Sequence, residues 1–205
     1  MQRIDVVRSL SELVNEGDLF VCAPTVGLWD DWWNYRPGGA DGTFSPAALG
    51  SISPAALGLA IALPHRRVTV LETDGSLLLN TGVMCTLGNE RPPNLTVVVL
   101  DNGLYEDIGG MPTHTAKHTD LARMAEGAGC INCVTVRDLP GFAEEARRLL
   151  TDGQLGFLVA KIQPGSYAWP PERRKPTDGI EDKYRFMRYI ERLEGVTIHA
   201  GAPRR

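Results

Sequence analysis

The chain has 205 residues, of which 43% are hydrophobic and 22% charged, and its formal net charge is −4. These values are ordinary for a globular protein, and a chain of this length buries roughly 70% of the surface of its unfolded form. The negative charge argues against a nucleic-acid-binding protein. No apolar run approaches membrane-spanning length, and the first residues lack an apolar signal segment. We therefore expect a cytoplasmic protein with no nucleic-acid and no membrane partner.

The predicted elements alternate between helix and strand along the chain. Apolar periodicity and turn residues predict helices over 5–16, 45–63, 76–91, 120–127, 140–150 and 181–194, and strands over 18–23, 68–73, 96–100, 133–136 and 157–162. Such alternation is typical of an α/β fold with a doubly wound, mostly parallel sheet flanked by helices. We expect residues 1–205 to form a single domain with a C-terminal helical extension at 181–194.

Two stretches are ambiguous in their use. Residues 24–44 contain three tryptophans, a tyrosine and adjacent aspartates in a glycine-containing stretch that resembles a loop. We favour a pocket or subunit interface for these rings, and the alternative is a cap that buries them. The predicted helix 181–194 carries one apolar stripe, formed by Tyr184, Met187, Ile190 and Leu193. Packing of this stripe on the domain itself is favoured over docking on another chain.

Polar residues follow the two central strands at the point where each strand ends. Asp74 closes one strand and Asn102 follows the next, and parallel strands end at the same edge of a sheet, where α/β proteins bind ligands. A helix that begins near Ser76 directs free N–H groups to the same place and favours an anion. Carboxylate and amide oxygens there suit Mg²⁺ bridging to a diphosphate. The alternative is an ordinary βαβ unit with an Asp-Gly turn and a capping asparagine.

These residues resemble the diphosphate-binding motif of thiamine-diphosphate enzymes. The family pattern is Gly-Asp-Gly, about two dozen residues, then Asn-Asn. Here Asp74-Gly75 matches the first part, residues 76–100 intervene, and Asp101-Asn102 matches the second part. Thr73 and Asp101 depart from the pattern. The resemblance implies thiamine diphosphate and Mg²⁺ as cofactors, with Asp74, Asn102 and the backbone carbonyl of Leu104 as metal ligands. It also implies that Gly75, Ser76, Leu104 and Tyr105 contact the cofactor.

A second segment resembles the Gly-Ser-apolar-Gly segment of thiamine-diphosphate decarboxylases. The match is Gly50-Ser51-Ile52-Ser53, in which Ser53 replaces the second glycine. The resemblance implies that Ile52 separates the two cofactor rings, and that the carbonyl of Gly50 accepts a hydrogen bond from the aminopyrimidine. The alternative is that Ile52 is a core residue at the start of a helix.

The run from Leu49 to Gly82, with the segments 92–105 and 109–115, most resembles the split 2-oxoacid decarboxylases of the sulfopyruvate and phosphonopyruvate group. The resemblance implies a small 2-oxoacid substrate and a partner subunit with the pyrimidine-binding domain, which supplies the activating glutamate. Two alternatives stay open. One is the cofactor-binding subunit of a 2-oxoacid:ferredoxin oxidoreductase, and the other is a non-catalytic assembly subunit with the same fold.

The segment 109–118 follows the metal-binding strand and is expected over the reactive end of the cofactor. It places three basic side chains within five residues. We predict that His114 is a catalytic proton donor, because histidine is the side chain most often used for proton transfer, and that Lys117 and His118 bind an acidic group of the substrate. The alternative is a solvated loop with a basic tip. Cys130 and Cys133 have redox or metal spacing, but buried thiols entering a strand are the favoured interpretation.

Overall fold

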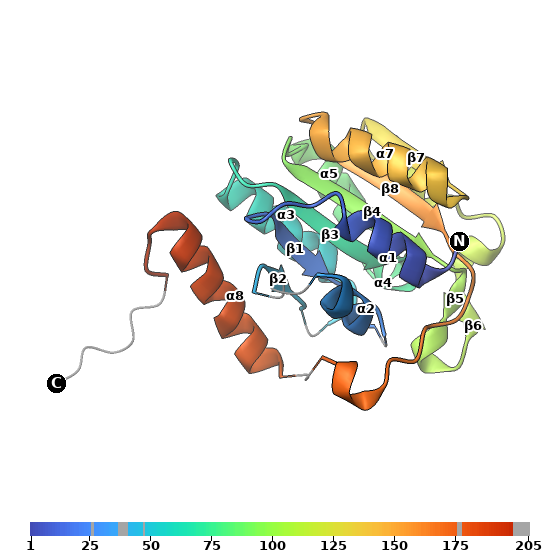
Figure 1. The fold of residues 1–205 in the computed structure, drawn as a ribbon. Helices are drawn as coiled ribbons and strands as arrows, with labels where there is room; N and C mark the ends of the chain where they lie inside the picture. Colours follow the sequence, from blue (N-terminus) through green and yellow to red (C-terminus); the bar gives the residue numbers. More distant parts are fainter. Residues whose placement is uncertain (26, 37–40, 47, 176–177, 199–205) are drawn as a thin grey trace.

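The computed structural model describes residues 1–25, 27–36, 41–46, 48–175 and 178–198. Within them, six parallel strands form one sheet in the order β2-β1-β3-β4-β8-β7 (Figure 1). The strands are β1 (Leu19–Cys22), β2 (Thr43–Phe44), β3 (Val68–Thr73), β4 (Leu95–Asp101), β7 (Asn132–Val136) and β8 (Gly156–Lys161). A separate antiparallel hairpin joins β5 (Leu104–Tyr105) to β6 (Met111–Pro112). The predicted doubly wound α/β class is confirmed.

Helices cover both faces of the sheet because its central strands are apolar on both sides. Every residue of β4 is buried. The α-helices are α1 (Arg3–Ser11), α2 (Leu28–Tyr35), α3 (Ile52–Ala62), α4 (Asp74–Leu78), α5 (Val83–Glu90), α6 (Leu121–Gly127), α7 (Leu139–Thr151) and α8 (Gly179–Glu194). One layer contains α1, which contacts α2 and α7, and another contains α5, which contacts α3 and α6 (Figure 1). In the described part of the chain, no helix has the length and apolar character needed to cross a membrane.

The register of the two central strands brings their ends together. Strand β3 pairs in parallel with β4 from Val68 opposite Leu95 to Thr73 opposite Leu100. Their carboxyl ends therefore lie side by side at one edge of the sheet. Asp74 directly follows β3, and Asn102 directly follows β4. The site predicted from the sequence consequently lies at this edge.

Three predicted helices have different bounds in the structure. The first ends at Ser11 rather than at residue 16, because a tight turn follows in which the Leu13 N–H donates to the Leu10 carbonyl. The helix predicted over 45–63 begins only at Ile52, since Gly50 has a φ of 80°, which is outside the helical region. The helix predicted over 76–91 is two helices, α4 and α5, separated by residues 79–82.

The preferred interpretation of the tryptophan-rich stretch, a pocket or subunit interface, was wrong for Trp29 and Trp32. The described part of residues 24–44 contains helix α2, and Trp29 and Trp32 are buried in the core. The Trp32 ring packs on Phe20 with centroids 4.3 Å apart, and its Nε1 donates to Thr43 Oγ1 at 2.9 Å. These rings therefore form a cap that buries itself, which was the alternative interpretation.

Helix α8 packs on the edge of the same domain near β2. Asp178 caps its N-terminus, and Phe186 stacks on Phe44 with centroids 5.6 Å apart. Its buried face carries Phe186 and Ile190, whereas Tyr184 from the predicted stripe is 40% exposed. The predicted packing on this domain is confirmed, but the buried stripe is rotated from the predicted one.

Candidate active site

A cavity of about 190 Å³ lies at the carboxyl edge of β3 and β4. Six of the predicted cofactor-binding residues line it: Asp74, Gly75, Ser76, Asn102, Leu104 and Tyr105. Glycine is required at position 75, because a Cβ there would lie 2.8 Å from the ring of Tyr105. The structure thus brings both predicted side-chain metal ligands and the Leu104 backbone to one cavity.

Asp74 is a buried carboxylate held by two threonine hydroxyls. Its Oδ2 accepts hydrogen bonds from Thr113 Oγ1 at 2.6 Å and from Thr115 Oγ1 at 3.0 Å. Burial raises the pKa of Asp74 above its usual range, the hydrogen bond from Thr113 lowers it, and the nearby charge of Asp101 raises it. No cationic side chain pairs with Asp74 among the described residues. Its charge would be balanced by a bound cation.

The Asn102 side chain is oriented by two hydrogen bonds. Its Oδ1 accepts from the Leu104 N–H at 2.8 Å, and its Nδ2 donates to Glu106 Oε2 at 2.8 Å. Because the amide nitrogen donates to the Glu106 carboxylate, the amide oxygen is the atom that faces the Leu104 backbone. An amide oxygen has two lone pairs, so it can accept the N–H and still bind a metal.

The two departures from the family motif have structural roles. Thr73 is the N-cap of α4, and its Oγ1 accepts from the Ser76 N–H at 3.4 Å. The Ser76 N–H is therefore not free, contrary to the expectation that it faces an anion, and α4 has only five residues. Asp101 is buried and forms an ion pair with Lys161 at the end of β8. Thr115 Oγ1 lies 2.8 Å from Asp101 Oδ1 and so bridges Asp101 to Asp74.

The structure places Ile52, the predicted ring-separating residue, away from the cavity. Ile52 is fully buried at the start of α3 and does not line the cavity, whereas Leu49 lines it and is 43% exposed. The reason is the turn at Gly50, whose positive φ reverses the chain just before the helix begins. Ile52 is thereby directed into the core, which was the alternative interpretation.

Gly50 itself is held by both of its backbone polar groups. Its N–H donates to Ser76 Oγ at 3.0 Å, and its carbonyl accepts from Asn80 Nδ2 at 3.0 Å. The carbonyl predicted to bind the aminopyrimidine thus already has one partner. Ser51 Oγ donates to the Ala48 carbonyl at 2.5 Å and does not line the cavity. Gly50 and Ser51 consequently shape the turn that carries Leu49.

A buried glutamate that the sequence analysis missed lies behind this turn. Glu72 is 1% exposed, and it accepts hydrogen bonds from Ser53 Oγ at 2.9 Å and from the Thr73 N–H at 3.1 Å. Burial raises its pKa to about 7, against the hydrogen bonds from Ser76 and Ser53, which lower it. Glu72 therefore connects the start of α3 to the start of α4.

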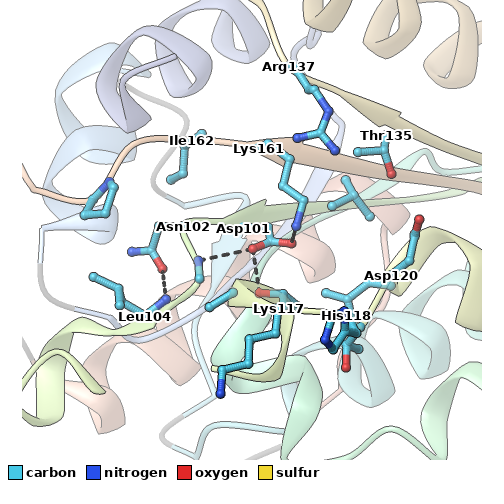
Figure 2. A pocket seen from close by; sticks show the side chains of 17 residues that line it. Asp101, Asn102, Leu104, Lys117, His118, Asp120, Thr135, Arg137, Lys161 and Ile162 are labelled. Carbon is cyan, nitrogen blue, oxygen red and sulfur yellow. Dashed lines mark hydrogen bonds and ion pairs between the residues drawn. The ribbon is translucent and has the colours of Figure 1, made fainter. Parts of the chain in front are cut away.

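The predicted substrate residues lie in a second, larger cavity of about 590 Å³. Lys117 and His118 line it, together with Asp101 and Lys161 (Figure 2). The two cavities share Asn102, Leu104 and Ile162 as a common wall.

Three further predicted residues stay outside both cavities. His114 is exposed in a 3₁₀ turn and lines neither of them. Cys130 is buried and Cys133 is half-buried in β7, and both thiols are free. Within the described ranges, no group of three or more histidine, cysteine or acidic side chains is arranged to hold a metal ion.

The family profile described as "Thiamine pyrophosphate enzyme, C-terminal TPP binding domain" matches residues 29–160. The chain belongs to this family. Thiamine pyrophosphate is another name for thiamine diphosphate, so the resemblance stated from the motifs is confirmed. Asp74 and Asn102 lie within the matched residues, as do most of the residues that line their cavity.

Similar sequences are found among decarboxylases of this family. Sulfopyruvate decarboxylase subunit beta from Methanocaldococcus jannaschii is 30% identical over 191 residues, which are 93% of this chain and 98% of that subunit. Sulfopyruvate decarboxylase from Methanosarcina acetivorans is 31% identical over 65% of this chain and 34% of its own length. Phosphonopyruvate decarboxylase from Streptomyces viridochromogenes is 37% identical over 58% of this chain and 30% of its own length.

Solved structures of related enzymes have the same fold. Benzoylformate decarboxylase from Polynucleobacter necessarius superimposes with a TM-score of 0.64 over 77% of this chain and 32% of that chain, at 21% identity. A thiamine-diphosphate-dependent 4-hydroxybenzoylformate decarboxylase from Rhodococcus jostii RHA1 gives a TM-score of 0.68 over 82% of this chain and 33% of that chain, at 19% identity. At these identities the similarity concerns the fold alone.

Proposed function

We propose that this chain is the thiamine-diphosphate- and Mg²⁺-binding subunit of a split decarboxylase that acts on a 2-oxo acid with a second acidic group. The observation that carries the proposal is the match along 98% of a sulfopyruvate decarboxylase beta subunit, combined with a cavity lined by Asp74, Gly75 and Asn102 of the diphosphate motif. Similar fused enzymes are about three times longer than the region they share with this chain. A separate partner subunit would supply what the shared region lacks.

The residues at the cavity fit a divalent cation and a diphosphate. Asp74 provides a buried carboxylate without a cationic partner in the described part of the chain, and Asn102 provides an oriented amide oxygen. With the Leu104 carbonyl these are hard oxygen donors of the kind that Mg²⁺ prefers. Gly75 allows the close approach that a side chain would prevent.

Each group of this chain has a positioning role in the reaction. When bound, thiamine diphosphate would supply a nucleophilic carbon for the ketone of a 2-oxo acid and an electron sink for the loss of carbon dioxide. Asp74, Asn102 and the Leu104 carbonyl would hold Mg²⁺, while Thr113 and Thr115 keep the Asp74 carboxylate in place. Leu49 would support the two rings, since it is one of the apolar residues that line the cavity, and Gly50, the residue after it, donates to Ser76 Oγ.

The mouth of the cavity is suited to a partner subunit. Leu49, Leu79 and Ile108 line the cavity and are 43%, 62% and 64% exposed. Large apolar side chains gathered around a site are typical of a surface that another protein covers. We propose that the covering subunit carries the pyrimidine-binding domain and the activating glutamate. The isolated chain would then bind the cofactor weakly and would not decarboxylate the 2-oxo acid.

The substrate residues predicted from the sequence stay predictions. Lys117 and His118 offer cationic donors for a second acidic group, and charge-assisted hydrogen bonds are roughly twice as strong as neutral ones. His114 has no contact with either cavity in this chain, so its proposed proton transfer requires the assembled enzyme.

The decisive experiment uses the complex purified from the native host with whatever subunit co-elutes. We expect cofactor- and Mg²⁺-dependent release of carbon dioxide, faster from sulfopyruvate or phosphonopyruvate than from pyruvate, and no release by the chain alone. Turnover by the isolated chain would refute the split enzyme. Reduction of ferredoxin by the complex would favour an oxidoreductase, and failure of the complex to bind thiamine diphosphate would favour an assembly subunit.

A further inference from the structure

The basic side chains that line the larger cavity come from three separate segments of the chain. Lys117 and His118 come from the loop after β6, Arg137 follows β7, and Lys161 ends β8. Figure 2 shows Arg137 and Lys161 above Asp101, with Lys117 and His118 below it. Its volume of about 590 Å³ lies within the range of small-molecule sites. The convergence of these side chains is a property of the tertiary structure alone.

The charges of the cavity leave positive groups without partners. Asp101 is paired with Lys161, and Asp120 caps α6 and lies 3.7 Å from Arg123. Both acidic residues of the lining are therefore occupied. Lys117 and Arg137 make no ion pair within the described residues. Two unpaired cations in one cavity create a positive potential that attracts anions.

Asp101 is held in place by several contacts at the cavity. It is 2% exposed, its Oδ1 lies 2.8 Å from Thr115 Oγ1, and it accepts a hydrogen bond from the Gly103 N–H at 3.2 Å in addition to its ion pair. The Lys161 side chain is 25% exposed. An ammonium has three donors, so Lys161 can bind Asp101 and also donate into the cavity.

From this arrangement we infer that the cavity is a second anion-binding site, separate from the diphosphate site, for a small molecule with a phosphate, sulfonate or carboxylate group. The two cavities share Asn102, Leu104 and Ile162, whereas the cationic residues Lys117 and Arg137 line only the larger one. The moderate volume favours a small molecule over an acidic peptide. The inference does not depend on the proposed decarboxylase activity, because it concerns binding to this chain.

The test measures the binding of inorganic phosphate to the full chain by equilibrium dialysis, with and without saturating thiamine diphosphate and Mg²⁺. We expect one saturable phosphate per chain that the cofactor does not displace. Arg137→Ala and Lys117→Ala should each weaken phosphate binding about tenfold or more, since each removes a charged hydrogen-bond donor. Arg147→Ala is the matched control, because it removes one exposed positive charge from α7 outside every cavity described here.

Several results would overturn the inference. They are the absence of saturable binding, displacement of phosphate by the cofactor, or an equal loss in Arg147→Ala and Arg137→Ala. Asp74→Ala should abolish cofactor binding and leave phosphate binding intact, so failure of the cofactor site is distinguishable from failure of this one.

A second arm identifies the source of the ligand, using the complex with its partner subunit. If Arg137→Ala raises the KM for a dianionic 2-oxo acid but not for pyruvate, the site binds the acidic group of the substrate. If the KM values of both are unchanged while phosphate binding is lost, the site binds a separate small anion.

Discussion

Replacing Glu72 with glutamine tests the electrostatics behind the candidate active site. Glu72 is fully buried, and its pKa is raised from 4.5 to about 7 by burial. In the structure it accepts hydrogen bonds from Ser53 Oγ and the Thr73 N–H. Glu72→Gln preserves the shape and keeps these contacts, because the amide oxygen accepts the N–H and the serine hydroxyl can reverse its hydrogen bond.

The magnitude and sign follow from the linkage of proton binding to folding. A difference of about 2.5 pKa units at about 1.36 kcal/mol per unit is about 3 kcal/mol. Because the pKa is raised in the folded state, this stability is fully present below pH 4.5 and is lost as the pH rises through about 7. Glutamine does not titrate, so the variant escapes this loss. Relative to wild type, its free energy of unfolding should increase by about 3 kcal/mol between pH 4.5 and pH 8.

The assay is urea denaturation of both proteins at closely spaced pH values, with Glu144→Gln on the exposed side of α7 as the control for net charge. The difference between wild type and Glu72→Gln isolates this group from other residues that titrate in the same range. If the difference in the free energy of unfolding between the two proteins stayed constant from pH 4.5 to pH 8, burial would not disfavour the ionised form of Glu72, and the reasoning would be wrong.

Three further predictions concern the site and its support. Thiamine diphosphate with Mg²⁺ at a hundred times its dissociation constant should stabilise the wild type by about 2.7 kcal/mol in a thermal-shift assay, and an equal shift in Asp74→Ala would contradict the metal assignment. Ile52→Ala should lower the free energy of unfolding by about 2–5 kcal/mol, because Ile52 is a core residue. Leu49→Ala should change the free energy of unfolding by less than about 0.5 kcal/mol but weaken cofactor binding. The reverse pattern would support Ile52 as the ring-separating residue. Gly88→Ala should destabilise the chain by about 1–3 kcal/mol in urea, because its Cβ would lie 2.1 Å from the Ala128 carbonyl oxygen, and unchanged stability would mean that this contact relaxes freely.

The sequence by itself determined the alternation of strands and helices and the positions of Asp74 and Asn102 at two strand ends. Both depend on local signals, since apolar β-branched runs predict buried strands and the parallel arrangement brings their ends to one edge. The family motif extended this reasoning to the cofactor. The helix bounds were less predictable, because the turns at Gly50 and at residues 79–82 depend on contacts between them, such as the hydrogen bond from Asn80 to Gly50.

Only the tertiary structure decided which side chains serve the site. Whether Leu49 or Ile52 lines the cavity depends on the direction in which a single turn points, and a spacing pattern does not specify that direction. Thr115 reaches Asp74 across 41 positions of the chain, and Arg137 and Lys161 line the same cavity because β7 and β8 are neighbours in the sheet. Such arrangements arise from packing between segments that are distant in sequence, and local periodicity does not predict them.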